Sequence, residues 1–421
     1  MRLTRVAVIV IVAACVAILA ATVRPDFSLG ARSWTNCIIC GGRGTADAIV
    51  NLILFAPLGV GLALARVPVG LAVLAGALLS AVAESAQTVL PGRDPGLGDL
   101  LFNTAGAGIG YALVPLTLAL ARFTDRTAAR LSLAAGFLVA LGVAATGWLL
   151  QPSLYPSAYW GLWTPRLGHL AWYRGRVTSA KIDGVEVPYR RIRDSAWARS
   201  ALLSGRAIEV EAIAGPPVRA VAPLFGVFDD HHVEMVLIGP DREDLVYRYR
   251  TRAVALRLDQ PDLRLRRGMR GIAAGDSLRV RVWSPAPGSH CLTTPAAQAC
   301  GLGFTPGAGW GLLLYPESFP EWLRRGLSLG WVGTLVLPLG FLLRRRWESA
   351  VALAVAATAF GALPIVVALR PTGAGEWLGI ALGLAAGTIA SGAVRRYRPL
   401  TPAPASPSPA PFQVDEDGIT Q

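Results

Sequence analysis

The chain has 421 residues, of which 53% are hydrophobic and only 16% are charged, and its mean hydropathy is +0.47. Because soluble globular proteins carry about 25% charged residues, this composition excludes disordered, collagenous and purely cytosolic classes. The net charge is +13, and Lys181 is the single lysine among 40 basic residues, so 40 − 1 leaves 39 arginines. An excess of this size fits nucleic acid, anionic lipid or membrane topology, and the positions of the arginines decide among them.

Apolar runs long enough to cross a bilayer, which takes about 20 residues, occur in two groups separated by a long polar interval. They are predicted to be helices, because isolated strands leave backbone groups unsatisfied in lipid. The predicted spans are Val6–Val23, Ala48–Ala65, Val67–Leu90, Leu100–Ala121, Leu131–Leu150, Gly326–Leu343, Ser349–Leu369 and Trp377–Val394. The first run is interpreted as a retained anchor rather than a signal peptide, since it exceeds the usual apolar length of about 7–15 residues.

Arginine placement orients these spans, because cytoplasmic loops are enriched in arginine. With the N-terminus in the cytoplasm, the cytoplasmic connections hold Arg66, Arg122, Arg126, Arg130, Arg344–Arg346, Arg395, Arg396 and Arg398. The short outer loops agree except the first, which carries Arg24, Arg32 and Arg43. We therefore predict a multi-pass membrane protein, in contact with membrane lipid and with both termini cytoplasmic. Arginines that flank spans argue against a nucleic-acid partner.

The polar interval alternates apolar and polar residues in short stretches separated by turn signals such as Gly215-Pro216-Pro217. This pattern favours antiparallel strands in a sandwich, with Arg279 and Arg281 facing solvent. The predicted strands lie in Ala207–Ala214, Leu245–Asp259, Ser277–Trp283, Met235–Ile238 and Gly311–Tyr315. The predicted fold class is an α-helical integral membrane protein of about eight spans with an inserted all-β sandwich. Its parts are a five-span membrane domain (1–150), an extracytoplasmic β-sandwich (151–321), three further spans (322–398) and a disordered Pro-rich cytoplasmic tail (399–421).

Four of the five cysteines fall outside the predicted spans, on the side where oxidation is permitted. Cys291 and Cys300 are predicted to form a disulfide, because the loop between them is short enough to be restrained by one. Cys37 and Cys40 form a C-x-x-C that is interpreted as a local disulfide or an idle pair, since two cysteines make half a zinc site. Cys15 is read as a small apolar residue of the first span.

Polar residues gather near one end of the second, third and fourth spans, and polar groups in a membrane usually mark function or a buried structural pair. They are Asp47, Asn51, Glu84, Gln87, Arg93, Asp99 and Asn103. One interpretation is structural: Arg93 pairs with Asp99 or Glu84, and the amides join neighbouring helices. The other is a ligand-binding or lipid-facing site that opens outward. Gly106 and Gly110 continue the fourth span as a small-residue face that allows close helix packing.

At these residues the sequence resembles a known family. The run Glu84-Ser-Ala-Gln87, Pro91-Gly-Arg93 and Asp99-Leu-Leu-Phe-Asn103-Thr-Ala-Gly106, preceded by Asn51-Leu-Ile-Leu-Phe55-Ala-Pro57, looks like the pattern of the VanZ-like membrane proteins over residues 25–120. This resemblance implies a location in the bacterial inner (plasma) membrane, a role at the cell envelope and an association with lowered susceptibility to the glycopeptide teicoplanin. The polar middle region is more loosely similar to concanavalin A-like or laminin-G-like jelly rolls.

Catalytic alternatives have weaker signals. The stretch Asp229-Asp230-His231-His232 is interpreted as a solvated hairpin loop, so no metal is predicted. Glu209 and Glu211 share a strand face, as a glycosidase carboxylate pair would, but the sequence that follows them does not match a jelly-roll glucanase signature. No cofactor is predicted. The sequence favours non-catalytic binding of an envelope glycan, a lipid-linked precursor or another amphiphile; a transporter of a lipid-like molecule and an envelope-modifying enzyme are the alternatives.

Overall fold

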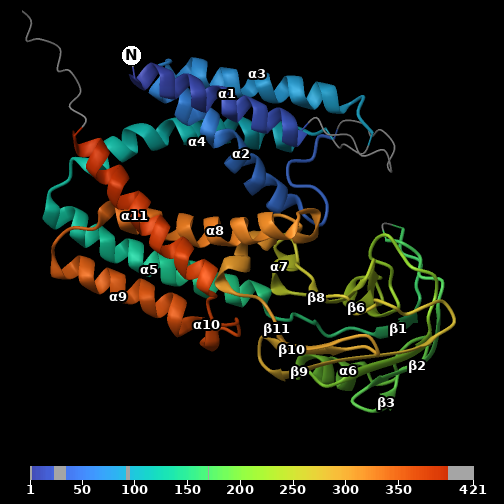
Figure 1. The fold of residues 1–421 in the computed structure, drawn as a ribbon. Coiled ribbons are helices and arrows are strands. Elements are labelled where there is room, and N and C mark those ends of the chain that lie inside the picture. Colours follow the sequence, from blue (N-terminus) through green and yellow to red (C-terminus); the bar gives the residue numbers. More distant parts are fainter. Residues whose placement is uncertain (1, 23–34, 92–94, 169, 397–421) are drawn as a thin grey trace, which may run out of the picture.

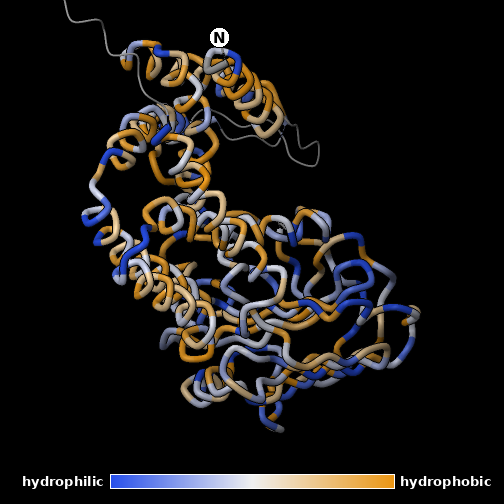
Figure 2. The backbone as a smooth tube through the Cα atoms, turned by 60° about the vertical axis from the view of Figure 1, so that its left-hand side comes forward, coloured by the Kyte–Doolittle hydropathy of each residue, from blue (hydrophilic) through white to orange (hydrophobic). Residues whose placement is uncertain are grey.

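The computed structural model describes residues 2–22, 35–91, 95–168 and 170–396, and it divides into a helical part and a β domain (Figure 1). Seven of the described helices are long and apolar enough to cross a membrane. They are α1 (Arg2–Thr22), α2 (Gly44–Leu64), α3 (Val69–Gln87), α4 (Leu97–Ala121), α5 (Asp125–Leu150), α8 (Glu321–Leu342) and α11 (Ala374–Arg396). Figure 2 shows apolar residues along these helices and hydrophilic residues concentrated in the β domain.

The eighth predicted span, Ser349–Leu369, is divided into α9 (Trp347–Gly361) and the short α10 (Leu363–Val366). Its 15 helical residues in α9 rise about 22 Å, which is less than the roughly 30 Å of a hydrocarbon core. The break coincides with Pro364, which lies at the start of α10 and cannot donate a helical hydrogen bond.

The helices form two groups. In the first, α2 and α4 pack closely, with α1 against α2 and α3 against α4. In the second, α8 packs on α11 and α5 packs on α9, around a separate hydrophobic core. Glycines bring helices together in both groups: an added Cβ at Gly110 would lie 1.9 Å from the Ala56 carbonyl oxygen, and one at Gly383 would lie 2.2 Å from that of Gly333.

The β domain consists of two antiparallel sheets whose side chains share one hydrophobic core. The five-stranded sheet has the order β1-β5-β6-β7-β8 and contains β1 (Tyr159–Trp163), β5 (Phe225–Asp229), β6 (Glu234–Asp241), β7 (Asp244–Tyr249) and β8 (Leu263–Leu265). The six-stranded sheet has the order β11-β10-β9-β4-β2-β3 and contains β2 (Arg176–Ile182), β3 (Val185–Glu186), β4 (Ile208–Ile213), β9 (Ser277–Ala286), β10 (Ser289–Thr293) and β11 (Gln298–Leu302). The connections include α6 (Ser195–Leu203), α7 (Arg252–Ala255) and the 3-10 helices η1 (Pro306–Leu312) and η2 (Pro316–Ser318).

Strands with alternating side chains are confirmed, most clearly in β9, where Val280 and Val282 are buried while Arg279 and Arg281 face solvent. Two predictions in this region are wrong. The strand expected over Leu245–Asp259 ends at Tyr249, because the chain turns there into α7. The residues expected to form a strand over Gly311–Tyr315 are instead the end of the 3-10 helix η1 and the turn that follows it. No strand forms there because η1 packs against α8 and α5.

Both disulfides are present: Cys291–Cys300 joins β10 to β11, and Cys37–Cys40 closes a turn before α2. The first is the predicted pair, and the second settles the open interpretation of the C-x-x-C in favour of a local disulfide.

Candidate functional site

Six predicted polar residues lie at one end of the first helix group, which we call the polar cluster. They are Asp47 and Asn51 of α2, Glu84 and Gln87 of α3, and Asp99 and Asn103 of α4. They share this end because α3 runs opposite to α2 and α4, so its end lies beside their beginnings (Figure 1). The seventh predicted residue, Arg93, lies outside the described residues.

Two side-chain amides of the polar cluster join α4 to its neighbours. Asn51 Nδ2 donates to Asp99 Oδ1 at 2.6 Å, which connects α2 with α4. Asn103 Nδ2 donates to Ser80 Oγ at 2.9 Å, which connects α4 with α3. Ser80 was not singled out from the sequence, because a serine within an apolar span is a common packing residue. These bonds satisfy polar groups that lipid would leave unsolvated.

The two α3 residues of the cluster are buried and contact backbone. Glu84 Oε2 accepts from the Gly96 N–H at 3.0 Å, so its carboxylate holds the segment that leads into α4. Gln87 Nε2 donates to the Thr22 carbonyl oxygen at 3.2 Å, at the end of α1. Each contact therefore ties the end of α3 to the backbone of a neighbouring segment.

Asp47 differs from the other members because it is exposed, and with Asp99 it lines a cavity of about 770 Å³ that we call the loop cavity. One wall is formed by residues 35–43, the disulfide loop, and the other by the first turns of α2 and α4. Thr35 pairs with the backbone at Gly96, which holds the loop against the start of α4. The approach is close: a Cβ at Gly98 would lie 2.2 Å from the Ile38 carbonyl oxygen.

The disulfide loop is also held by the β domain, through residues that follow α7. Arg257 Nη1 donates to the Ile39 carbonyl oxygen at 2.7 Å, and Arg43 Nη2 lies 3.1 Å from Asp259 Oδ2. Burial raises the pKa of Asp259, and the Arg43 charge opposes that rise. Sequence reasoning missed this contact. The available signal was Arg43 itself, which departs from the arginine pattern of the outer loops and here has an acidic partner.

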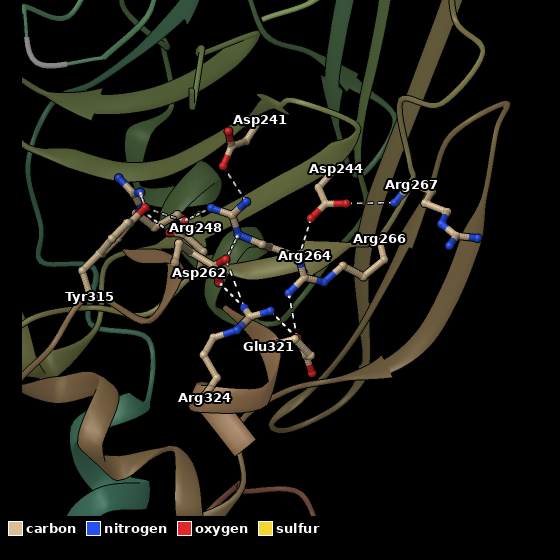
Figure 3. A network of polar contacts seen from close by, with 11 residues as sticks. Asp241, Asp244, Arg248, Asp262, Arg264, Arg266, Arg267, Tyr315, Glu321 and Arg324 are labelled. Atoms are coloured by element: carbon tan, nitrogen blue, oxygen red, sulfur yellow. Dashed lines mark hydrogen bonds and ion pairs between the residues drawn. The ribbon is translucent and has the colours of Figure 1, made fainter. Parts of the chain in front are cut away.

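A second polar network joins the β domain to α8, and it too was not predicted (Figure 3). Arg248 Nε lies 2.5 Å from Asp262 Oδ1, and Arg264 contacts Asp262 at 3.2 Å and Asp241 at 2.6 Å. Glu317 lies between Arg264 and Arg324, at 3.0 and 3.1 Å, so the network continues into the first turn of α8.

Charge pairing sets the electrostatics of this network. Burial alone would lower the pKa of Arg248, but Asp262 and Glu234 together raise it above its ordinary value. The arginines and carboxylates of this network neutralise one another, and buried charges need such pairing to be tolerated.

The remaining sequence candidates have structural partners. Glu209 pairs with Arg281 at 3.2 Å and Glu211 with Arg279 at 2.8 Å, across β4 and β9. Asp229 Oδ1 accepts from two backbone N–H groups, of His231 and Val233, at 2.9 and 2.7 Å, as in a hairpin turn. Within the described ranges, no group of three or more His, Cys, Asp or Glu is placed to hold a metal ion.

Comparison with known proteins supports a local relationship. The VanZ/LLP1 family model matches residues 25–122, which contain α2, α3, α4, the disulfide loop and the whole polar cluster. No curated protein and no solved structure matches the chain. The chain thus contains a VanZ/LLP1 domain, accompanied by further apolar helices and a β domain that the family model does not cover.

Proposed function

We propose that this chain is a VanZ-like envelope membrane protein that binds a glycan or another amphiphile without catalysis, at the outer membrane–water interface. The loop cavity is the observation that carries the proposal. It lies within the VanZ/LLP1 domain, at the helix ends, and it is lined by the carboxylates of Asp47 and Asp99. Carboxylates accept hydrogen bonds from sugar hydroxyls and attract ammonium groups, so either ligand class suits them.

The β domain is the proposed recognition module for an envelope glycan or a lipid-linked precursor. Its contacts with the disulfide loop, through Arg257 and Asp259, place it beside the loop cavity. The concanavalin A-like or laminin-G-like comparison is supported only by its two antiparallel sheets and its size. In this proposal the β domain is extracytoplasmic, and the link to teicoplanin follows from the family resemblance.

The decisive variant is Asp47→Asn, which removes the charge at the cavity wall and keeps the shape of the side chain. We expect it to abolish any increase in teicoplanin or detergent tolerance that the wild-type chain gives when expressed in a susceptible bacterium. Membrane abundance should stay unchanged, because Asp47 is exposed on the first turn of α2. The measurement is the minimal inhibitory concentration at equal expression.

Glu186→Gln is the matched control, because it removes one exposed carboxylate from β3, far from the cavity in the sequence. It should retain the wild-type tolerance. If Asp47→Asn, expressed normally, keeps the same tolerance as Glu186→Gln, the loop cavity is not the binding site.

A further inference from the structure

A second cavity, of about 560 Å³, lies where the β domain meets the ends of helices of the second group. Leu150 and Gln151 lie at the end of α5. Val366 is the last residue of α10, and Ala368 lies two residues further along the chain. The opposite wall belongs to both sheets. This cavity shares no lining residue with the loop cavity.

Four side chains of the sheets form the polar wall of this cavity. Ser284 Oγ and His290 Nδ1 are 2.6 Å apart. The His290 ring lies 5.6 Å from the ring of Tyr247 and 5.2 Å from that of Tyr249, measured between centroids. The two tyrosines alternate on β7, so both face the same side, and β10 is irregular at His290 in its pairing with both neighbours. Irregular pairing of this kind often re-aims a side chain beside a site.

The lining of this cavity carries no formal charge, which is unusual in a chain with a net charge of +13. None of its described lining residues is Asp, Glu, Lys or Arg, whereas the loop cavity has Arg43 and Asp47. Burial lowers the pKa of His290 to about 4, so its imidazole is neutral at pH 7. Burial also raises the pKa of Tyr247 and Tyr249, so both phenols keep their protons.

An uncharged wall of hydroxyls, an imidazole and aromatic rings disfavours a phosphate or carboxylate, whose charge would lose its water without gaining a cation. It suits hydroxyl groups, which both donate and accept hydrogen bonds and whose carbon skeleton packs on aromatic rings. The wall at the helix ends is mainly apolar, with Leu150 and Val366, and the polar side chain of Gln151 lies among them.

We propose that this cavity binds an uncharged, hydroxyl-rich headgroup, such as the sugar of a neutral glycolipid, at the junction of the β domain and the membrane helices. Ser284, His290 and the two tyrosines hold the hydroxyls, and the apolar wall receives the start of the lipid chains. The site is independent of the loop cavity and therefore goes beyond the function proposed above.

The test uses the full chain in phosphatidylcholine nanodiscs that contain equal amounts of monoglucosyl diacylglycerol and phosphatidylglycerol. Native mass spectrometry of the released protein measures which lipid stays bound. We expect the glucolipid to be retained in preference to phosphatidylglycerol. Tyr249→Phe and Ser284→Ala should each weaken its retention by about 2- to 10-fold, the effect of one lost hydrogen bond.

Tyr189→Phe and Ser179→Ala are the matched controls, because they make the same changes elsewhere in the β domain. They should leave glucolipid retention unchanged. Methyl glucoside added in excess separates two sources of the headgroup: displacement of the glucolipid indicates that free sugar suffices, and persistence indicates a lipid ligand. Either result supports the uncharged headgroup chemistry.

Two results would overturn the proposal. One is equal retention of glucolipid and phosphatidylglycerol by the wild-type chain. The other is unchanged glucolipid preference in Tyr249→Phe, at a wild-type melting temperature. If Ser284→Ala does not fold, Tyr249→Phe alone serves as the test, because it removes one oxygen and keeps the packing of the ring.

Discussion

Glu234 shows how one buried carboxyl makes the stability of the β domain depend on pH. It lies on β6, with its carboxylate 3.8 Å from Arg248 Nη1. Burial raises its pKa, the Arg248 charge opposes that rise and the Asp262 charge adds to it, and together they bring the pKa of Glu234 to about 7. Between pH 4.5, the ordinary value, and about 7 the folded state binds more protons than the unfolded state. Stability should therefore fall as pH rises through this window and level off above it.

Glu234→Gln removes this titration. The melting temperature of the variant, relative to that of the wild type at the same pH, should therefore rise as pH increases from 5 to 8. A shift from 4.5 to about 7 corresponds to at most about 3 kcal/mol. Thermal unfolding of the full chain, followed by tryptophan fluorescence, measures the difference between the two proteins at each pH. Taking this difference cancels the opposite trend from His290, whose lowered pKa reduces stability below pH 6.5. A constant difference across the range would show that Glu234 does not titrate there.

The residue scale also shows what sequence can predict of a site. Spacing and helix direction place Asn51 and Asp99 near one another, and the structure joins them by a hydrogen bond. Spacing says nothing of Ser80 or of the Thr22 carbonyl, because such partners depend on how whole helices pack. The second cavity, between the β domain and the helix ends, is still less predictable, since His290 and Tyr249 come from different sheets.

At the scale of elements, the sequence pattern predicts those helices and strands whose formation depends on residues close together in the chain. Apolar runs give the long helices to within a few residues, as for Leu100–Ala121 and α4. Alternation gives β4 and β9, which have one face in the core. It does not give β5, whose five residues are all buried, because such a strand has no alternation to detect. The helix break at α10 depends on a single proline within an apolar run.

Close packing of α2 on α4 gives the element-scale prediction. Gly110→Ala places a methyl group 1.9 Å from the Ala56 carbonyl oxygen, so the two helices must separate. Overpacking of this kind costs about 1–3 kcal/mol, and we expect a lower melting temperature of the full chain in detergent. Gly108→Ala is the control on the same helix, because its methyl group would meet Val73 at an ordinary 3.7 Å. Equal melting temperatures for the two variants would mean that the helices are not in contact at Gly110.

At the scale of the whole molecule, the second helix group has two chemically distinct ends. At one end Asp125, at the start of α5, lies 3.3 Å from Arg344 and 3.2 Å from Arg395. At the other end the helices meet the β domain: Gln151 Nε2 donates to the Val367 carbonyl oxygen at 3.4 Å, and the Arg370 N–H donates to that of Phe304 at 2.8 Å. The segment of α9 and α10 runs between these two ends (Figure 1).

This polarity yields a topology prediction, because arginines concentrate at the Asp125 end and cytoplasmic ends are rich in arginine. We expect reporters inserted near Thr127 or Arg345 to give a cytoplasmic signal. A reporter at Gly184, in the open turn between β2 and β3, should give an external signal. Each site is fused in turn to alkaline phosphatase, which is active only outside the cytoplasm, and to a fluorescent protein that matures only inside it. Either location then gives a signal from one of the two reporters.

The same experiment also tests the division of the eighth predicted span. If α9 with α10 returns the chain to the β-domain side, fusions at Arg345 and Gly373 must report opposite sides, although α9 alone is short for a bilayer. A cytoplasmic signal at Gly373 would mean that this segment does not cross. A cytoplasmic signal at Gly184 would place the β domain inside the cell. The Cys291–Cys300 disulfide of its β10–β11 pair, and the Cys37–Cys40 disulfide of the adjacent disulfide loop, would then lie in a reducing compartment. That outcome would remove the basis for an outward-facing site at either cavity.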